Sequence, residues 1–104
     1  MDDILKQLTE ILHQRKQADP QKSYVAKLYA QGLDVILKKV GEEATETIIA
    51  AKNGETQQLI YELADLWFHT LVLLAHHNLG PDAVLEELTR RLGTSGIAEK
   101  QSRC

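Results

Sequence analysis

Two groups of acidic side chains have the spacing expected of a carboxylate site. The first follows the pattern E-E-x-x-E and comprises Glu42, Glu43 and Glu46. The second follows E-x-x-D and comprises Glu62 and Asp65. Residues three or four apart share one face of a helix, so each group presents its carboxylates together. Converging carboxylates repel one another unless water, a raised pKa or a cation relieves them, and their hard oxygen ligands suit Mg²⁺.

A magnesium site of this kind predicts metal-assisted hydrolysis of a phosphoanhydride. The metal would neutralise phosphoryl charge, while carboxylates hold or deprotonate the attacking water. The competing interpretation is a solvated helix face on which Lys38, Lys39 and Lys52 pair with the glutamates. Glu62 and Asp65 favour the site, because acids on an otherwise apolar helix are rarely buried without a function. Spacing leaves the catalytic base unassigned among the carboxylates.

Helical periodicity predicts the elements that position these acids. The first helix should end before Asp19-Pro20, and a short one should run from a Ser23 cap to Gly32. We expect three further helices, from an Asp34 cap to about Lys52, from Thr56 to about Asn78, and from Asp82 to about Leu92. The last of these should turn Val84, Leu85 and Leu88 inward. The tail from residue 93 to 104 is rich in small and polar residues, so we expect a loop or mobile arm there, including residues 97–104.

The segment from Leu59 to Ala75 is unusually apolar, with 13 apolar residues among its 17. Of its four polar residues, all but Thr70 lie on a narrow polar stripe, which comprises Gln58, Glu62, Asp65, His69 and His76. So much apolar surface predicts packing on several sides, in a bundle core or against a second subunit. A short turn at Asn53-Gly54 favours antiparallel pairing with the preceding helix, which would bring the two acidic groups together. On this stripe we expect His69 to be a hydrogen-bonded core residue rather than a ligand.

Length and composition predict one all-α domain over residues 1–104, with a net charge of −3. The basic residues form no long run, which argues against a nucleic-acid surface. The single cysteine, Cys104, excludes an intrachain disulfide and favours a reducing, cytoplasmic setting. The first residues lack the basic and apolar regions of a signal peptide. The longest apolar stretch, Leu66 to Ala75, is too short to span a bilayer, so we expect no membrane segment.

The two acidic patterns resemble the signature of the MazG-like all-α nucleoside triphosphate pyrophosphohydrolases. Three longer segments are more specific: SYVAKLYAQGLDVILKKVGEEATE (23–46), ELADLWFH (62–69) and RLGTSGIAEKQSR (91–103). Together they resemble the phosphoribosyl-ATP pyrophosphohydrolases of histidine biosynthesis, and the similarity covers about residues 3–103. The resemblance implies a helical bundle, and the apolar surface of the segment from Leu59 to Ala75 predicts that a homodimer or a higher homo-oligomer completes it.

The implied activity is Mg²⁺-dependent hydrolysis of 1-(5-phosphoribosyl)-ATP to 1-(5-phosphoribosyl)-AMP and pyrophosphate. By resemblance, the metal ligands are Glu43, Glu46, Glu62 and Asp65. Glu42 matches the first acid of the motif, and we expect it either to support the ligands or to orient water; we group Glu42, Glu43 and Glu46 as catalytic. The chain is too short to include the cyclohydrolase that is fused to this activity in some bacteria, so it resembles the stand-alone form.

Six residues are candidate substrate contacts. Lys39 and Lys27 could place an ammonium group on the triphosphate. The family's S-Y element corresponds to Ser23 and Tyr24, and its C-terminal E-K-x-x-R element supplies Lys100 and Arg103. We expect these two elements to close over the substrate.

Three alternatives remain open at the level of sequence. The first is a house-cleaning pyrophosphatase of the same fold that acts on dNTPs or damaged nucleotides. The second is a carboxylate-bridged di-iron bundle, which needs two Glu-x-x-His pairs, although only Glu10 and His13 form one. The third is a non-catalytic helical interaction module, in which the acids are merely solvated.

Overall fold

The described part of the chain, residues 3–93 and 96–103 of a computed structural model, contains helices and loops and no strand. The α-helices are α1 (Asp3–Gln14), α2 (Tyr24–Gln31), α3 (Leu33–Lys52), α4 (Thr56–His76), α5 (Pro81–Arg90) and α6 (Gly96–Arg103), and a 3₁₀ helix, η1 (Arg15–Gln17), follows α1. The predicted all-α class is confirmed.

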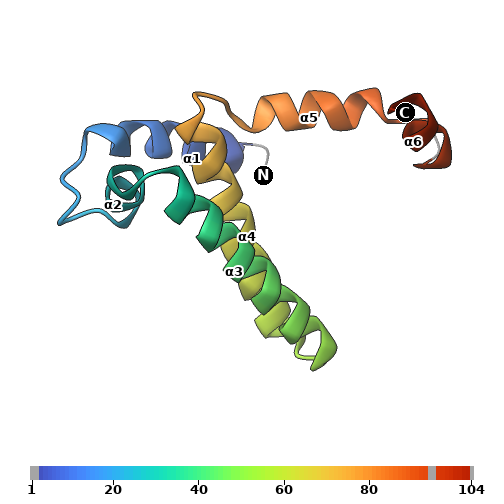
Figure 1. Cartoon of the computed structure of the whole chain (residues 1–104), viewed down its shortest axis with the longest axis horizontal. Coiled ribbons are helices and arrows are strands. Elements are labelled where there is room, and N and C mark those ends of the chain that lie inside the picture. Colours follow the sequence, from blue (N-terminus) through green and yellow to red (C-terminus); the bar gives the residue numbers. More distant parts are fainter. Residues whose placement is uncertain (1–2, 94–95, 104) are drawn as a thin grey trace.

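Helices α3 and α4 form a long antiparallel hairpin that projects away from the other helices (Figure 1). The turn between them uses Gly54 at φ 72°, a conformation that suits glycine. The Glu55 amide donates to the Ala50 carbonyl across this turn. Because the turn is so short, α3 and α4 pack side by side, as predicted.

The hairpin buries residues at intervals of seven. On α3 these are Ile36, Glu43 and Ala50, and on α4 they include Glu62 and His69. Such spacing keeps one line of side chains facing the partner helix. Glu43 therefore lies on the buried line of α3, between Ile36 and Ala50.

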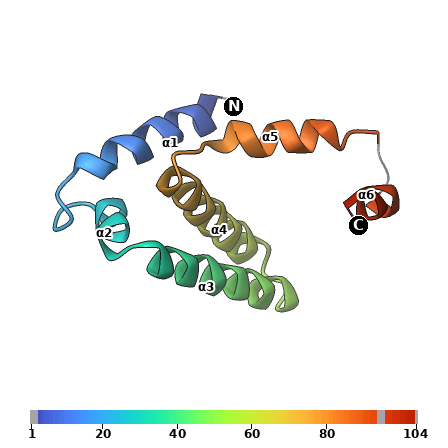
Figure 2. The same cartoon turned by 45° about the horizontal axis from the view of Figure 1, so that its top comes forward.

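The apolar core lies at the other end of the hairpin, where α1 and α2 cover the beginning of α3 and the end of α4 (Figure 2). Its most buried side chains are Leu12, Leu28, Ile36 and Val72. The Tyr29 hydroxyl donates to the Leu12 carbonyl at 2.9 Å and ties α2 to α1. This core holds the base of the hairpin, so the acidic groups are carried by two anchored helices.

Two predicted helix starts can be compared with the structure. Ser23 is the N-cap of α2, and its Oγ accepts from the Ala26 amide at 3.1 Å, as predicted. The predicted Asp34 cap of α3 is wrong: α3 begins at Leu33 after Gly32, whose φ of 98° ends α2 and starts α3 without an intervening loop. Asp34 instead lies in the first turn, where a carboxylate favours the helix dipole.

The C-terminal third also differs from expectation. Residues 96–103 form α6, so the predicted loop is wrong there, because the segment AEKQSR consists mainly of good helix formers. The apolar side of α5 was predicted to face inward, yet Val84, Leu85 and Leu88 are each about half exposed. Within one chain, α5 extends away from the hairpin rather than along it (Figure 1).

Helix α4 is long and apolar enough to cross a bilayer by length and composition, a weak test that the core helix of a folded domain also passes. This differs from the sequence-based expectation, which considered only the stretch from Leu66 to Ala75. Glu62 and Asp65 lie near the middle of α4, where charged side chains are costly in lipid.

Candidate active site

Three carboxylates from the two hairpin helices meet at one point. Oxygens of Glu43 on α3 and of Glu62 and Asp65 on α4 all lie within 4.8 Å of one another. Glu43 is 9% exposed and Glu62 7% exposed, although both are acids. We call these three residues the acid cluster. The predicted convergence of the two acidic groups is confirmed for these three residues.

The electrostatics of Glu62 show the strain of this arrangement. Burial raises its pKa above the ordinary value of 4.5, and the charges of Glu43, Glu46 and Asp65 raise it further. A hydrogen bond from the Gln58 amide at 3.3 Å opposes the shift but does not cancel it. The acid cluster is thus held together by the fold against its own repulsion, as a site for a cation would be.

The remaining two acids of the first group lie at the solvent side of the cluster. Glu46 is exposed, yet its charge contributes to the raised pKa of Glu62. Glu42 is also exposed and lies 3.5 Å from the Lys39 ammonium, which is 3.8 Å from Glu43. Burial disfavours the charged form of Lys39, but Tyr24, Glu42 and Glu43 outweigh it and raise the Lys39 pKa. Lys39 therefore stays charged beside the cluster.

Tyr24 of α2 is linked to Asp65 of the acid cluster through the buried His69 ring. The His69 ring is 4% exposed, and its Nδ1 lies 2.8 Å from the Asp65 carbonyl oxygen. A carbonyl only accepts, so Nδ1 carries the proton and Nε2 accepts from the Tyr24 hydroxyl, 2.8 Å away. His69 is thus a hydrogen-bonded core residue, as predicted, rather than a free ligand.

The Tyr24 hydroxyl also lies within electrostatic reach of the acid cluster. Burial raises its pKa, and the charges of Glu43 and Asp65 add to the shift while Lys39 opposes it. Tyr24 was predicted as a substrate contact, but its pairing with His69, 45 residues away, carries no signal in the sequence.

The other predicted substrate contacts are more scattered. Ser23 precedes Tyr24 and uses its Oγ as the α2 cap, and Lys27 is exposed on α2. Lys100 is exposed on α6, which lies far from the hairpin in both views (Figures 1 and 2). Arg103 ends α6, and its side chain lies outside the described residues. Within one chain the structure therefore does not bring Lys100 to the acid cluster.

A groove of about 550 Å³ runs beside the first turn of α2 and reaches Tyr24. Its walls include two cations that sequence reasoning missed, Arg15 and Lys22, together with Asp19 and Phe68. We call it the α2 groove. Isolated basic residues give no sequence signal, so only the fold reveals that these two share a groove with Tyr24.

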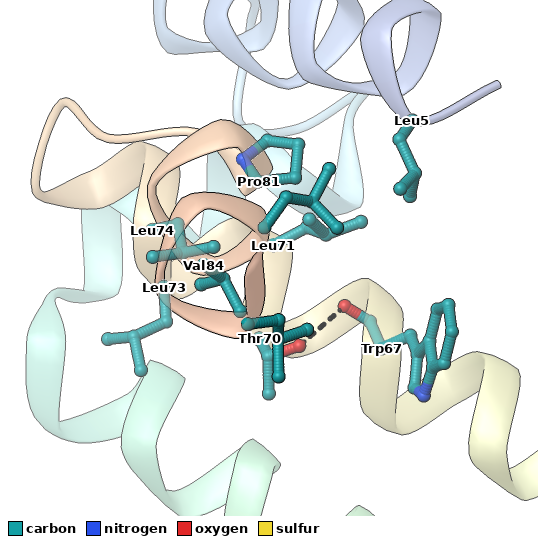
Figure 3. A pocket seen from close by; sticks show the side chains of 10 residues that line it. Leu5, Trp67, Thr70, Leu71, Leu73, Leu74, Pro81 and Val84 are labelled. Atoms are coloured by element: carbon teal, nitrogen blue, oxygen red, sulfur yellow. Dashed lines mark hydrogen bonds between the residues drawn. The ribbon is translucent and has the colours of Figure 1, made fainter. Parts of the chain in front are cut away.

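A second groove, of about 450 Å³, is lined almost entirely by apolar side chains (Figure 3). Leu5 of α1, Trp67 and Leu71 of α4, and Pro81 and Val84 of α5 line it. Its polar side chain, Thr70, donates its hydroxyl to the Trp67 carbonyl at 2.8 Å. We call it the α5 groove. It offers nothing to bind an anionic nucleotide.

Comparison with known proteins adds independent findings. Residues 5–92 match the sequence model of the family described as phosphoribosyl-ATP pyrophosphohydrolase. A phosphoribosyl-ATP pyrophosphatase from Methylococcus capsulatus is 65% identical over 97% of this chain and 96% of its own. Proteins of the same name from Geobacter sulfurreducens and Nitrosomonas eutropha are 58% and 55% identical, over 98% and 96% of this chain and 94% and 86% of their own.

The matched region contains the whole hairpin and therefore the entire acid cluster. The relatives extend the similarity through almost all of the chain, beyond the point where the family match ends. With the family match covering most of the residues and the fold and acid cluster in agreement, the chain belongs to the phosphoribosyl-ATP pyrophosphohydrolase family.

Proposed function

We propose that this protein hydrolyses 1-(5-phosphoribosyl)-ATP to 1-(5-phosphoribosyl)-AMP and pyrophosphate, as a Mg²⁺-dependent cytoplasmic enzyme of histidine biosynthesis. The observation that carries the proposal is the acid cluster, because the fold holds three repelling carboxylates within 4.8 Å in a protected position. The names of the relatives supply the substrate.

The donor set of the acid cluster fits Mg²⁺. The cluster offers carboxylate oxygens, and in the described part of the chain it includes no histidine or cysteine. The three carboxylate oxygens lie within 4.8 Å of one another, close enough for a single cation to be held between them. The same donor set argues against a di-iron site, since both nitrogens of His69 are engaged elsewhere.

In the proposed reaction a water oxygen attacks the α-phosphorus. The bond between this phosphorus and the oxygen that bridges it to the β-phosphate breaks, and pyrophosphate leaves. When bound, Mg²⁺ supplies charge neutralisation at the phosphoryl oxygens. Glu43, Glu62 and Asp65 would hold the cation and so would orient the triphosphate over the hairpin. Lys39, charged beside Glu43, offers an ammonium group to a phosphate oxygen.

Glu46 and Glu42 are the candidates to bind the attacking water. Glu42 is paired with Lys39, whereas Glu46 forms no ion pair within the described residues. Glu46 can serve as a fourth ligand or accept the proton of the water, and Mg²⁺ titration of Glu46→Gln separates these roles. If Glu46 is a fourth ligand, the variant should bind Mg²⁺ more weakly. If Glu46 is the base, the variant should have a lower kcat at saturating Mg²⁺.

The direct test is pyrophosphate release from phosphoribosyl-ATP, measured with and without Mg²⁺. We expect turnover that requires Mg²⁺ and falls at least about a hundredfold in Asp65→Asn, because one ligand is lost. The matched control, Glu86→Gln, removes an exposed acid of α5 and should retain turnover. Release from dNTPs but not from phosphoribosyl-ATP would instead identify a house-cleaning pyrophosphatase, and no hydrolysis at all would favour an interaction module.

We further propose that the working unit is a homodimer. Helix α4 turns its polar stripe toward α3, while Ile60, Tyr61 and Trp67 are more than half exposed. Ile48 on α3 is also largely exposed. A second copy laid against this apolar side would complete a four-helix bundle. Lys100 and Arg103 could then reach an acid cluster from the partner's α6, in keeping with their predicted role.

A further inference from the structure

The α2 groove is built differently from the other surfaces near the acid cluster. It contains two cationic side chains, Arg15 at the start of η1 and Lys22 just before α2. Neither forms an ion pair among the described residues. The neighbouring Lys16, by contrast, donates to the Asn78 side chain at 2.8 Å. The groove thus holds positive charge that the protein does not use for its own stability.

Polar groups beside these cations are suited to an anion. The Ser23 Oγ accepts the Ala26 amide, which leaves its hydroxyl hydrogen available for an acceptor oxygen. The one carboxylate in the groove wall, Asp19, accepts from the Gln21 amide at 2.9 Å and so is directed at its own turn. A phosphate group beside Arg15, Lys22 and Ser23 would therefore meet more hydrogen-bond donors than carboxylate acceptors.

The groove is joined to the acid cluster through aromatic side chains. Tyr24 and Phe68 both line it, and their rings pack edge-on against His69 at centroid distances of 5.8 and 5.4 Å. His69 in turn holds the Asp65 carbonyl. A ligand that lies along Tyr24 can hence extend from the cluster into the groove, with the apolar faces of these rings beside its uncharged middle part.

We propose that the α2 groove binds the 5′-phosphate of the phosphoribosyl group, with Arg15 and Lys22 as its charged contacts. This inference rests on the proposed function, because phosphoribosyl-ATP has two anionic ends separated by two riboses and the adenine base. The triphosphate end needs the acid cluster and its cation. The monophosphate end needs cations at a distance from those carboxylates, and the α2 groove supplies them whereas the apolar α5 groove does not.

The test compares phosphoribosyl-ATP with its 5′-dephosphorylated form in the wild-type protein and in Arg15→Gln, Lys22→Gln and the double variant. The wild type should prefer the phosphorylated substrate, and each substitution should lower kcat/KM for it about tenfold, the size expected of a charge-assisted contact. The dephosphorylated substrate should be unaffected. The control Lys52→Gln removes an exposed cation at the end of α3 and should change neither value.

Two results would overturn the assignment. Equal losses of kcat/KM on both substrates would show that these cations contact the triphosphate instead. If the double variant kept the wild-type preference for the phosphorylated substrate, neither cation would contact the 5′-phosphate. Calorimetric binding of ribose 5-phosphate without metal provides a readout that does not need turnover. If the wild type binds ribose 5-phosphate and the double variant does not, the α2 groove is a phosphate site, even if hydrolysis of phosphoribosyl-ATP is absent and the proposed function fails. If the wild type does not bind ribose 5-phosphate, the assignment of the groove is wrong.

Discussion

At the scale of single residues, the burial of Glu62 among other acids has an electrostatic cost. Its carboxylate is surrounded by three other acids, and it keeps one weak amide donor from Gln58. The raised pKa means that the folded chain binds a proton more tightly than the unfolded chain does. Stability therefore falls as the pH rises from the ordinary value of 4.5 through the raised folded value.

Glu62→Gln should raise Tm at pH 7 in the absence of divalent cations, because it removes the buried charge. The gain should shrink as the pH falls to about 4.5, where Glu62 is increasingly protonated in the wild type. Thermal unfolding between pH 4 and 8 measures both effects. Added Mg²⁺ should raise Tm of the wild type more than that of the variant. A variant that is less stable than the wild type at pH 7 would contradict this account of the acid cluster.

At the scale of elements, the placement of Tyr24 depends on how α2 joins α3. Gly32 ends one helix and starts the next, with φ 98° and ψ −179°, a conformation almost confined to glycine. The Ser23 cap defines the other end of α2. Together they fix the direction of α2 and so allow the Tyr24 hydroxyl to reach His69 across the helix interface.

Gly32→Ala should lower the free energy of unfolding by about 1–3 kcal/mol, since alanine is strained at this backbone conformation even though its Cβ would have room. Gly41→Ala is the matched substitution inside α3, where a Cβ also meets nothing within 4 Å and the backbone is helical. It should stabilise the protein by about 0.5–1 kcal/mol. Urea denaturation of both variants checks the opposite signs, and the same sign in both would refute the role given to Gly32.

At the scale of the whole molecule, a single chain is unusually extended. Its radius of gyration is 15.8 Å, whereas a compact domain of this length has about 13 Å. The projecting hairpin and the outstretched α5 account for the difference (Figure 1). Exposed apolar side chains line both parts, and this exposed surface supports the proposed homodimer.

Leu85→Glu should shift the protein from a dimer toward a monomer, because it places a charge in the apolar α5 groove. Sedimentation equilibrium should give twice the 11.7 kDa chain mass for the wild type and a smaller value for the variant. Glu86→Ala, at the next position on α5 and outside the groove, should leave the mass unchanged. A monomeric wild type at micromolar concentration would refute the dimer.

Local patterns were sufficient to predict the helices and the two acidic groups. Helical periodicity, the Ser23 cap and the glycine stops depend on neighbours a few residues away, so they can be read without the fold. The family resemblance and its acidic motif are likewise properties of the linear sequence, and the family is confirmed. The loop predicted for the C-terminal tail was wrong, because the prediction relied on its glycines and small residues and neglected the helix-forming residues that follow them.

Contacts between distant segments were decided only by the tertiary structure. Packing of α3 against α4 placed Glu43 on the buried line of α3. It also joined Tyr24 to His69 and gathered Arg15 and Lys22 into one groove. Each of these depends on how whole helices cross and pack, and periodicity along one helix contains no information about its neighbour. The sequence by itself therefore determined the elements and the acids, and the tertiary packing decided which acids share one site and which apolar faces remain uncovered.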